Sequence, residues 1–252
     1  MSSPSSPATS GLPGQVTAVI LAGGLGTRLR PVVQDRPKVL APVAGRPFIY
    51  YLLDQLIEAR VPRAIVCTGY QAQQVEQTLG PRYGTVQLQY SREQQPLGTA
   101  GAVRLAAGQL ATPLALVLNG DSFCGGTLTH FLHWHRRSRF LGSLLLVYQE
   151  QTDRFGRVAL GSDHTVLAFE EKRSGLGPGL INAGVYLLER ELLERIPAQV
   201  PLSLERDVFP RWAAQGLLGG YPTRAPFLDI GVPEAFHQAQ DFFASLDLPS
   251  LS

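Results

Sequence analysis

The stretch VTAVILAGGLGTRLRPVVQDRPK, residues 16–38, joins an apolar run to a glycine-rich loop and a basic segment. Its apolar first part, Val16–Leu21, has the length and composition of a buried strand. Gly23, Gly24 and Gly26 follow directly. Successive backbone N–H groups in such a turn form an anion-binding nest, and glycine lets an anion approach the backbone closely. The stretch therefore predicts an α/β fold with a phosphate-binding loop after its first strand.

The loop matches neither of the two common phosphate-binding patterns. No third glycine follows Gly24 and Gly26 at the spacing of a dinucleotide-binding fingerprint, and no Gly-Lys-Ser/Thr follows at the spacing of a Walker loop. The loop offers positive charge instead, from Arg28, Arg30, Arg36 and Lys38. Because proline fixes the backbone, Pro31 and Pro37 are expected to stiffen the returning segment and to bring Lys38 back over the same anion.

The rest of the chain alternates strands and helices up to about residue 127. Strands are expected over residues 63–68, 85–90 and 114–118, and helices over 47–59, 72–78 and 99–108. Past residue 128 the pattern predicts helices over 128–137, 189–196, 204–214 and 234–244, and strands over 144–148, 157–160, 166–169 and 181–188. This order predicts a Rossmann-like α/β fold, with a mixed, mostly parallel sheet flanked by helices.

Composition predicts how the chain divides into domains. Residues 1–15, MSSPSSPATSGLPGQ, are rich in Ser, Pro and Gly and poor in apolar residues, which predicts a disordered leader. Residues 16–252 are expected to form a single domain, with a first half over about 16–127 and a second half over about 128–252.

Bulk properties exclude several function classes. The net charge is +2 with acids and bases interspersed, so no basic surface for nucleic acid is expected. No apolar run approaches the ~20 residues of a membrane span, and the first residues lack the basic and apolar segments of a signal peptide. Cys67 and Cys124 lie in separate apolar segments without metal-ligand spacing, which favours reduced thiols and a cytoplasmic protein.

Two aspartates that follow apolar runs are candidate metal ligands. Asp121, in LVLNGD, comes just past a predicted strand, where open α/β sheets bind ligands. Asp229, in FLDIGVPE, has a similar setting and is followed by a predicted helix. Two carboxylates close to a phosphate-binding loop suit Mg²⁺, which combines one or two carboxylates with phosphate oxygens. The alternative for Asp121 is a role in the turn itself.

Two further segments are candidates for substrate contacts. EQQPLGTAGAV, residues 93–103, combines a Pro-Leu-Gly turn with a helix start of small residues, which leaves room for a flat ring against Gly98. A plain loop-to-helix turn capped by Thr99 is the alternative. FEEKRSG, residues 169–175, places Lys172 after a predicted strand beside two glutamates, where a lysine suits a phosphate. The alternative there is a solvated run of charges.

Other reactive side chains lack the context of a catalytic site. His130, His133 and His135 form no HExxH arrangement and follow no strand end, so they are expected on the surface of a helix. Ser122 and Cys124 have no Ser-His-Asp or Cys-His context. Nucleophilic catalysis is therefore not expected.

Six motifs resemble, in order, those of the sugar-1-phosphate nucleotidyltransferases: AGGLGTRLRP…RPK, PLGTAGA, NGD, EEK, NAGVYL and FLDIG. The resemblance spans about residues 16–243. It implies the nucleotide-diphospho-sugar transferase type of fold, with a nucleotide half first and a sugar half second. It also implies a Mg²⁺-dependent reaction, in which a sugar 1-phosphate attacks the α-phosphorus of a nucleoside triphosphate and releases pyrophosphate.

The resemblance implies roles for individual residues and names the partners. The expected catalytic residues are Arg28, Lys38 and Asp121, and the expected Mg²⁺ ligands are Asp121 and Asp229. The residues expected to hold the nucleotide are Leu21, Ala22, Gly23, Gly24, Gly26, Thr27, Arg28, Lys38, Glu93, Pro96, Gly98, Thr99, Asn119 and Gly120. Those expected to hold the sugar phosphate are Gly156, Glu171, Lys172, Asn182 and Glu205. The implied partners are GTP or another nucleoside triphosphate and a sugar 1-phosphate, with no nucleic acid and no membrane; a homo-oligomer is left open.

Two features narrow the choice of base and sugar. Glu93 suits guanine, whose N1–H and N2–H groups one carboxylate accepts together, although uridylyltransferases acting on N-acetylmuramate 1-phosphate also show glutamate there. SLERDVFP, residues 203–210, resembles a segment of heptose- and mannose-1-phosphate guanylyltransferases. The short D-glycero-α-D-manno-heptose 1-phosphate guanylyltransferases are the most similar group, so GDP-heptose is the expected product. Three alternatives remain: a mannose-1-phosphate guanylyltransferase, an N-acetylmuramate 1-phosphate uridylyltransferase, and a non-catalytic, nucleotide-binding regulatory homologue.

Overall fold

The computed structural model describes residues 13–29, 31–126, 128–170, 175 and 177–246. Ten of the described strands form one sheet. They are β1 (Val16–Leu21), β4 (Arg63–Thr68), β5 (Arg82–Tyr83), β6 (Val86–Arg92), β7 (Leu114–Asn119), β9 (Gly142–Gln149), β10 (Arg157–Leu160), β11 (Val166–Glu170), β12 (Gly179–Glu189) and β13 (Leu218–Thr223). Two small antiparallel pairs lie beside it: β2 (Pro42–Val43) with β3 (Arg46–Pro47), and β8 (Ser122–Cys124) with β14 (Phe227–Asp229).

The large sheet is mixed, and its first half is parallel. The strand order is β11-β10-β12-β7-β1-β4-β6-β5, with β9 paired to β12 and β13 paired to β9. β7, β1, β4 and β6 run parallel, whereas β12 is antiparallel to both β7 and β9. One continuous sheet therefore runs through both halves of the chain.

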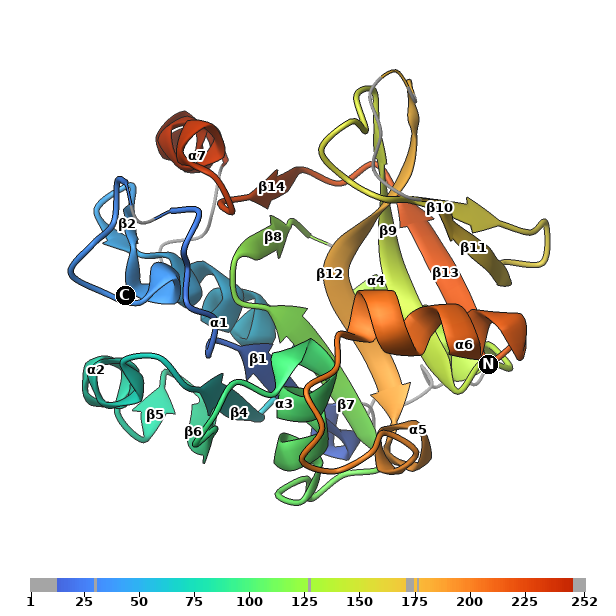
Figure 1. The fold of residues 1–252 in the computed structure, drawn as a ribbon, viewed down its shortest axis with the longest axis horizontal. Coiled ribbons are helices and arrows are strands. Elements are labelled where there is room, and N and C mark those ends of the chain that lie inside the picture. The colour runs from blue at the N-terminus through green and yellow to red at the C-terminus, as the bar shows by residue number, and fades with distance from the viewer. Residues whose placement is uncertain (1–12, 30, 127, 171–174, 176, 247–252) are drawn as a thin grey trace, which may run out of the picture.

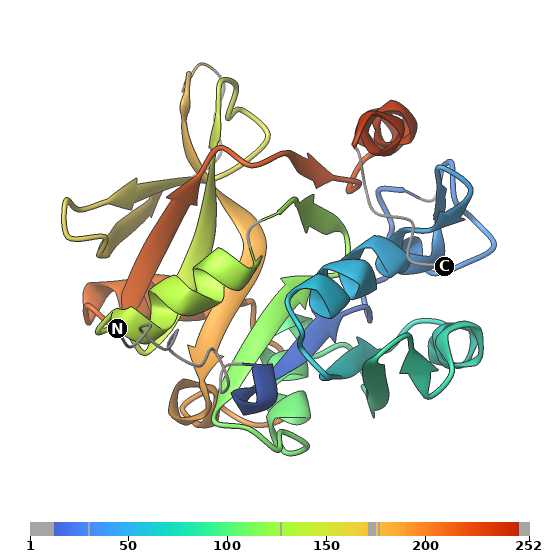
Figure 2. The same ribbon diagram turned by 180° about the vertical axis from the view of Figure 1, so that it is seen from behind.

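Helices cover both faces of this sheet (Figures 1 and 2). Their bounds are α1 (Phe48–Glu58), α2 (Ala72–Leu79), α3 (Gly98–Ala107), α4 (Leu128–Arg137), α5 (Arg190–Glu194), α6 (Phe209–Ala214) and α7 (Pro233–Ser245). α1, α4 and α7 contribute buried side chains to the core on one face, and α3, α5 and α6 to the core on the other. The predicted α/β class, with a mixed sheet flanked by helices, is confirmed.

In the described part of the chain, three short helical turns of other types lie outside these helices. They are two 3-10 turns, Pro13–Gln15 and Lys38–Leu40, and a π-helical turn, Leu204–Val208, which leads into α6. One continuous helix was expected over 204–214. Pro210 has no N–H with which to bond the preceding turn of a regular helix, and the structure has the wider turn before it.

The C-terminal part of the chain returns to the first half. After β13 the chain crosses toward β8 as β14 and then forms α7, which lies beside β2 (Figure 1). Phe243 of α7 packs against Phe48 and Tyr51 of α1. This return carries Asp229, the last residue of β14, to the edge of the sheet where β7 ends.

One expectation about α4 is wrong. His135, expected on the helix surface with His130 and His133, is buried, with 3% of its surface exposed. Its Nδ1 is hydrogen-bonded to the Ser143 hydroxyl at 2.7 Å, and its Nε2 lies 3.7 Å from Glu189 Oε1. Burial among these neighbours lowers the pKa of His135 to about 4. His135 is therefore part of the packing between α4 and the sheet.

Cys67 and Cys124 are both buried thiols, as expected. Burial raises the pKa of the Cys67 thiol, which keeps it protonated. None of the described helices is long and apolar enough to span a bilayer.

Candidate active site

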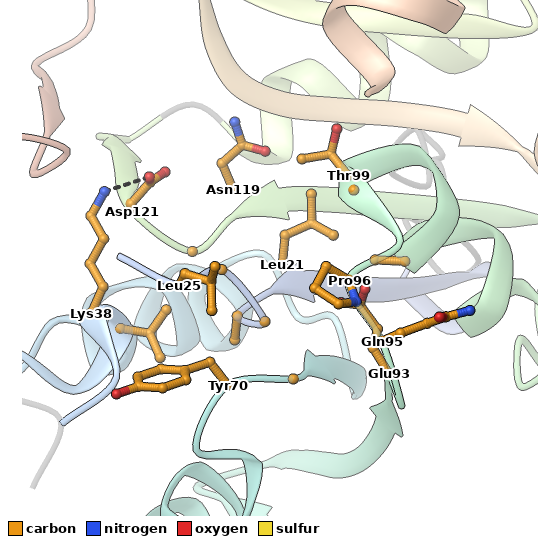
Figure 3. A pocket seen from close by; sticks show the side chains of 18 of the residues that line it. Leu21, Leu25, Lys38, Tyr70, Glu93, Gln95, Pro96, Thr99, Asn119 and Asp121 are labelled. Atoms are coloured by element: carbon orange, nitrogen blue, oxygen red, sulfur yellow. Dashed lines mark hydrogen bonds and ion pairs between the residues drawn. The ribbon is translucent and has the colours of Figure 1, made fainter. Parts of the chain in front are cut away.

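A cavity of about 500 Å³ opens at the carboxyl ends of β1, β4, β6 and β7 (Figure 3). Five segments line it. Four of them lie at the ends of these four strands, and the fifth begins at Lys38. The lining residues are Leu21, Ala22, Gly23, Gly24, Leu25, Lys38, Val39, Gly69, Tyr70, Glu93, Gln94, Gln95, Pro96, Gly98, Thr99, Ala102, Asn119, Gly120 and Asp121. Parallel strands end at one edge of the sheet, so residues distant in sequence meet there.

Glu93 lies at one end of the cavity, together with Gln95 and Pro96 (Figure 3). Its Oε2 accepts the Leu97 N–H at 2.7 Å. Its Oε1 packs so closely on the glycine loop that a Cβ at Gly23 would lie 2.6 Å away. Burial raises the pKa of Glu93, and the Leu97 hydrogen bond opposes that shift only in part. This end of the cavity therefore presents a half-buried carboxyl group next to a glycine backbone.

The start of α3 is held by the chain around residue 202. Gly98 has a φ of +68°, and a Cβ there would lie 2.4 Å from the Leu202 carbonyl oxygen. Leu202 in turn accepts the Ala100 N–H and donates its own N–H to the Leu97 carbonyl, each at 2.9 Å. Glycine is required at position 98 both for the backbone angle and for this close approach. One side of Gly98 is thus occupied by protein, and its other side faces the cavity.

Lys38 and Asp121 lie at the opposite end of the cavity (Figure 3). Lys38 Nζ donates to Asp121 Oδ2 at 2.6 Å, and the two side chains are 12% and 33% exposed. The stem of Lys38 packs against the glycine loop, since a Cβ at Gly26 would lie 3.3 Å from Lys38 Cβ. The loop and the returning segment therefore place one lysine ammonium beside the carboxylate that follows β7.

Asp229 reaches the same end from the far part of the chain. In the β8–β14 pair it lies opposite Ser122, and the Ile230 N–H donates to the Asp121 carbonyl at 2.9 Å. Its Oδ1 accepts the Gly231 N–H at 2.5 Å. The pKa of Asp229 is raised, first by burial and then by the negative charge of Asp121, and Lys38 opposes this shift. The two expected metal ligands are thus neighbours across a strand pair.

The donor set at this end fits Mg²⁺. Among the described residues no group of three or more His, Cys, Asp or Glu side chains forms a protein-only metal site. Mg²⁺ does not need one, because it is held in enzymes by one or two carboxylates together with phosphate oxygens and waters. Asp121 and Asp229 supply two such carboxylates next to a cavity with room for phosphates.

Glu205 lies behind the wall of the cavity and does not line it. Its carboxylate accepts three hydroxyl groups: Thr99 at 3.0 Å, Ser203 at 2.9 Å and Tyr186 at 3.0 Å. The Tyr186 hydroxyl also accepts the side-chain amide of Asn182 at 2.9 Å. Tyr186 is fully buried, which raises its pKa. The carboxylate thus links Thr99, in the cavity wall, to Asn182, a residue expected to face the sugar.

The structure places most of the residues expected to bind nucleotide in the cavity wall and separates others from it. Gly26, Thr27 and Arg28 do not line the cavity, and Arg28 is exposed. Asn182 and Gly156 also lie outside its wall; Gly156 precedes β10. Glu171 and Lys172 lie outside the described residues.

Several wall residues were not expected from the sequence. They are Leu25, Val39, Gly69, Tyr70, Gln94, Gln95 and Ala102. For most of them, the only feature of the sequence that could have predicted their place in the wall is their position next to an expected residue. Arg154 was also missed. Its positive charge opposes the rise in the pKa of Asp229, so it acts on the carboxylate pair from the second half of the chain.

The chain is similar to known proteins over most of its length. A family model described as nucleotidyl transferase matches residues 17–245. The mannose-1-phosphate guanylyltransferase of Mycobacterium tuberculosis is 38% identical over 225 residues, which are 88% of this chain and 63% of that protein. The chain thus spans less than two thirds of that relative.

Two further relatives match over nearly their whole length. The D-glycero-alpha-D-manno-heptose 1-phosphate guanylyltransferase of Aneurinibacillus thermoaerophilus is 34% identical over 223 residues, 88% of this chain and 96% of that protein. The crystal structure of HddC from Yersinia pseudotuberculosis complexed with GMP-PN is 31% identical, with a TM-score of 0.79 over 90% of this chain and 99% of that chain. The fold is of the nucleotide-diphospho-sugar transferase type, as expected.

Proposed function

Because the chain belongs to the nucleotidyl transferase family, we propose that it transfers GMP from GTP to a sugar 1-phosphate and releases pyrophosphate. The observation that carries this proposal is the cavity itself, with a carboxyl group at one end and a lysine between two aspartates at the other. Relatives named guanylyltransferases, at 38% and 34% identity, support guanine as the base.

The reaction needs no general base from the protein. The attacking oxygen belongs to a phosphate monoester, whose second pKa is near 6, so it is already ionised at neutral pH. It forms a bond to the α-phosphorus of GTP, and the bond from that phosphorus to the β-phosphate bridging oxygen breaks. Pyrophosphate leaves with the electron pair. The protein contributes by positioning the two phosphates and by neutralising their charge.

The residues of the cavity suit these tasks. The glycine loop presents its backbone to the triphosphate, and Lys38 places a positive charge where the phosphates lie. Glu93, in the cavity wall, would accept the N1–H and N2–H groups of guanine. Asp121 and Asp229 would hold Mg²⁺, which when bound supplies further positive charge to the triphosphate and the sugar phosphate.

The sugar is proposed as D-glycero-α-D-manno-heptose 1-phosphate. A heptose 1-phosphate guanylyltransferase matches 88% of this chain with 96% of its own length. Mannose 1-phosphate is the second candidate, because a mannose-1-phosphate guanylyltransferase has the higher identity, 38%. The two sugars share the manno configuration, so the same hydroxyl contacts would serve both.

A pyrophosphate-release screen tests the proposal. GTP, ATP, UTP and dTTP are each combined with D-glycero-α-D-manno-heptose, mannose, glucose and N-acetylmuramic acid 1-phosphates in the presence of Mg²⁺. GTP with the heptose phosphate is expected to give the fastest release, and EDTA is expected to stop it. No release from any pair would favour a nucleotide-binding homologue without catalytic activity.

Two substitutions test the residue roles in the same assay. Lys38→Ala and Asp121→Ala are each expected to lower turnover by ~10²–10³, because each removes one preorganised charge-stabilising group. Circular dichroism and thermal unfolding check that both variants remain folded. Near-wild-type turnover in both would show that these residues do not act on the phosphates.

A further inference from the structure

The ammonium of Lys38 lies where the two candidate metal ligands meet. Nζ is 2.6 Å from Asp121 Oδ2. It also lies over the turn that follows Asp229, since a Cβ at Gly231 would be 3.5 Å from Nζ and 2.5 Å from Asp229 Oδ1. A lysine ammonium and a divalent cation are both compact charges that bind carboxylate oxygens. Both would therefore use the same carboxylate of Asp121.

We propose that Lys38 is a built-in competitor of the divalent cation. Its ammonium holds Asp121 until the phosphates of a nucleotide draw it away, and the cation then gains full access to Asp121 and Asp229. The release of Asp121 by a bound nucleotide rests on the proposed function. The competition itself depends only on Lys38 and the two carboxylates.

The position of Lys38 favours such an exchange of partners. The start of its side chain is fixed, because Cβ packs against Gly26, whereas the rest of the stem runs along the cavity wall to Asp121. A rotation of this flexible four-carbon stem moves Nζ from the carboxylate toward phosphates in the same cavity. Phosphate oxygens offer the ammonium an equivalent charged partner.

The carboxylates alone are a poor site for the cation. Among the described residues they have no third acidic, histidine or cysteine ligand nearby, so phosphate oxygens or waters complete the coordination, and phosphates are the charged ligands of the two. A nucleotide would thus add ligands for the cation and remove its competitor in one step. By thermodynamic linkage, the cation and the nucleotide then strengthen each other's binding.

Titration with Mn²⁺ tests the competition without turnover. The signal of free Mn²⁺ in electron paramagnetic resonance is followed as protein is added, with no nucleotide or sugar present. Lys38→Met is expected to bind Mn²⁺ about tenfold or more tightly than the wild type, because the neutral side chain no longer competes for Asp121. Adding Asp121→Asn to this variant is expected to abolish the gain in Mn²⁺ affinity.

Arg36→Met is the matched control. It removes one positive charge from the same loop, but Arg36 pairs with the exposed Asp35, at 2.6 Å, and not with Asp121. Its Mn²⁺ affinity is expected to stay within about twofold of the wild type, since exposed charges are screened. An equal gain in Arg36→Met, or no gain in Lys38→Met, would overturn the proposal.

Calorimetry with GTP in EDTA tests the release step. Lys38→Met is expected to bind metal-free GTP about tenfold more weakly, because Lys38 has moved to the phosphates in the wild-type complex. Unchanged GTP affinity in this variant would overturn the release step. If the Mn²⁺ result holds but the wild type binds no GTP, the competition stands and the proposed function fails.

Discussion

At the scale of single residues, Glu93 holds a turn and is also the residue proposed to bind the base. One of its oxygens holds the Leu97 N–H, and the other packs against Gly23. We expect Glu93→Gln to keep the turn, because the amide oxygen still accepts the Leu97 N–H, while losing the acceptor pair for guanine. The kcat/KM for GTP is expected to fall about 10- to 100-fold, the range for a hydrogen bond to a charged group. Kinetics with GTP and UTP measure this, and an unchanged preference for GTP would contradict it.

The raised pKa of Glu93 also predicts a pH dependence. The guanine contacts require the ionised carboxylate, which is lost as pH falls through a pKa above the usual range. The kcat/KM for GTP is therefore expected to decline on the acid side at a higher pH than an ordinary glutamate would give. Glu93→Gln, which has no titrating group, is expected to lose this limb of the profile.

Residue positions were predictable from sequence where strand ends fix them. Gly23, Gly24 and Asp121 could be assigned to one cavity because parallel strands end at one edge of the sheet, and Lys38 because the loop was expected to return to the same place. The position of Arg28 could not be predicted. Leu29 is buried, with 1% of its surface exposed, and anchors the turn so that Arg28 faces solvent. Whether a basic side chain of the loop enters the cavity depends on such packing.

At the scale of elements, Glu205 connects the segment before α6 to the start of α3 and to β12. We expect Glu205→Ala to lower the free energy of unfolding by about 1–3 kcal/mol, since it leaves the buried Tyr186 hydroxyl without its acceptor. Glu205→Gln is expected to recover part of this loss, because its amide oxygen can accept the same hydroxyl. Urea unfolding measures both values.

A positioning role for Glu205 has a kinetic consequence that separates it from stability alone. Glu205→Ala removes the acceptor of the Thr99 hydroxyl and of the Tyr186 hydroxyl, to which Asn182 is bonded. The kcat is therefore expected to fall at temperatures where the variant is fully folded. Glu205→Gln is expected to restore kcat more than KM. An unchanged kcat in the alanine variant would show that the network only stabilises the fold.

The buried histidine of α4 makes stability depend on pH. The pKa of His135 is lowered from 6.5 to about 4, so the unfolded chain binds a proton between these values and the folded protein does not. Stability is therefore lost as pH falls from 6.5 toward 4, by about 2 kcal/mol between pH 7 and pH 5. Urea unfolding of wild type and His135→Gln at both pH values measures this.

Comparing the wild type with His135→Gln isolates the contribution of His135 to the pH dependence of stability. The raised pKa of Glu189 acts in the opposite sense, because the folded protein then takes up a proton more readily than the unfolded chain. This contribution is shared by wild type and His135→Gln. A loss of stability on acidification that is the same in both proteins would contradict the role of His135.

Elements with a clear apolar pattern were predictable from sequence, whereas glycine-rich strands and strands of three residues were not. β4, β10 and α4 have the bounds expected from their apolar patterns. β13 was missed because LGGYPT reads as a turn; its glycines are needed since a Cβ at Gly219 would lie 2.2 Å from the Phe140 ring. β8 and β14 have three residues each, too few for a period to show.

At the scale of the whole molecule, the site depends on the chain closing on itself. Asp121 follows β7 in the first half, but Asp229 arrives only after the second half has been built onto β12 and β9. Sequence could show both aspartates but not that a three-residue strand pair sets them side by side. The residues expected to form a single domain are thus joined by the sheet and again by β14 and α7.

The packing of α7 onto α1 predicts that the molecule unfolds as one unit. Phe243 is 5% exposed, stacks on Tyr51 with ring centroids 3.7 Å apart, and meets Phe48 and Phe123 edge to face. We expect Phe243→Ala to lower the free energy of unfolding by about 3–5 kcal/mol, the usual cost of emptying a buried aromatic site. Phe242→Ala, which removes a partly buried ring one position earlier, is the control and is expected to cost less.

The shape of the urea transition decides whether α7 belongs to that unit. If α7 folds with the sheet, Phe243→Ala moves the midpoint to lower urea and leaves a single transition with an unchanged m-value, because the same surface is exposed at once. If α7 instead folds as an independent unit, the variant shows a separate transition at lower urea, and the sheet unfolds at the same urea concentration as in the wild type. Loss of turnover should then follow that early transition, since Asp229 lies in β14 directly before α7. We expect the first result, because the aromatic cluster joins α7 to side chains from α1 and β8 in the same core.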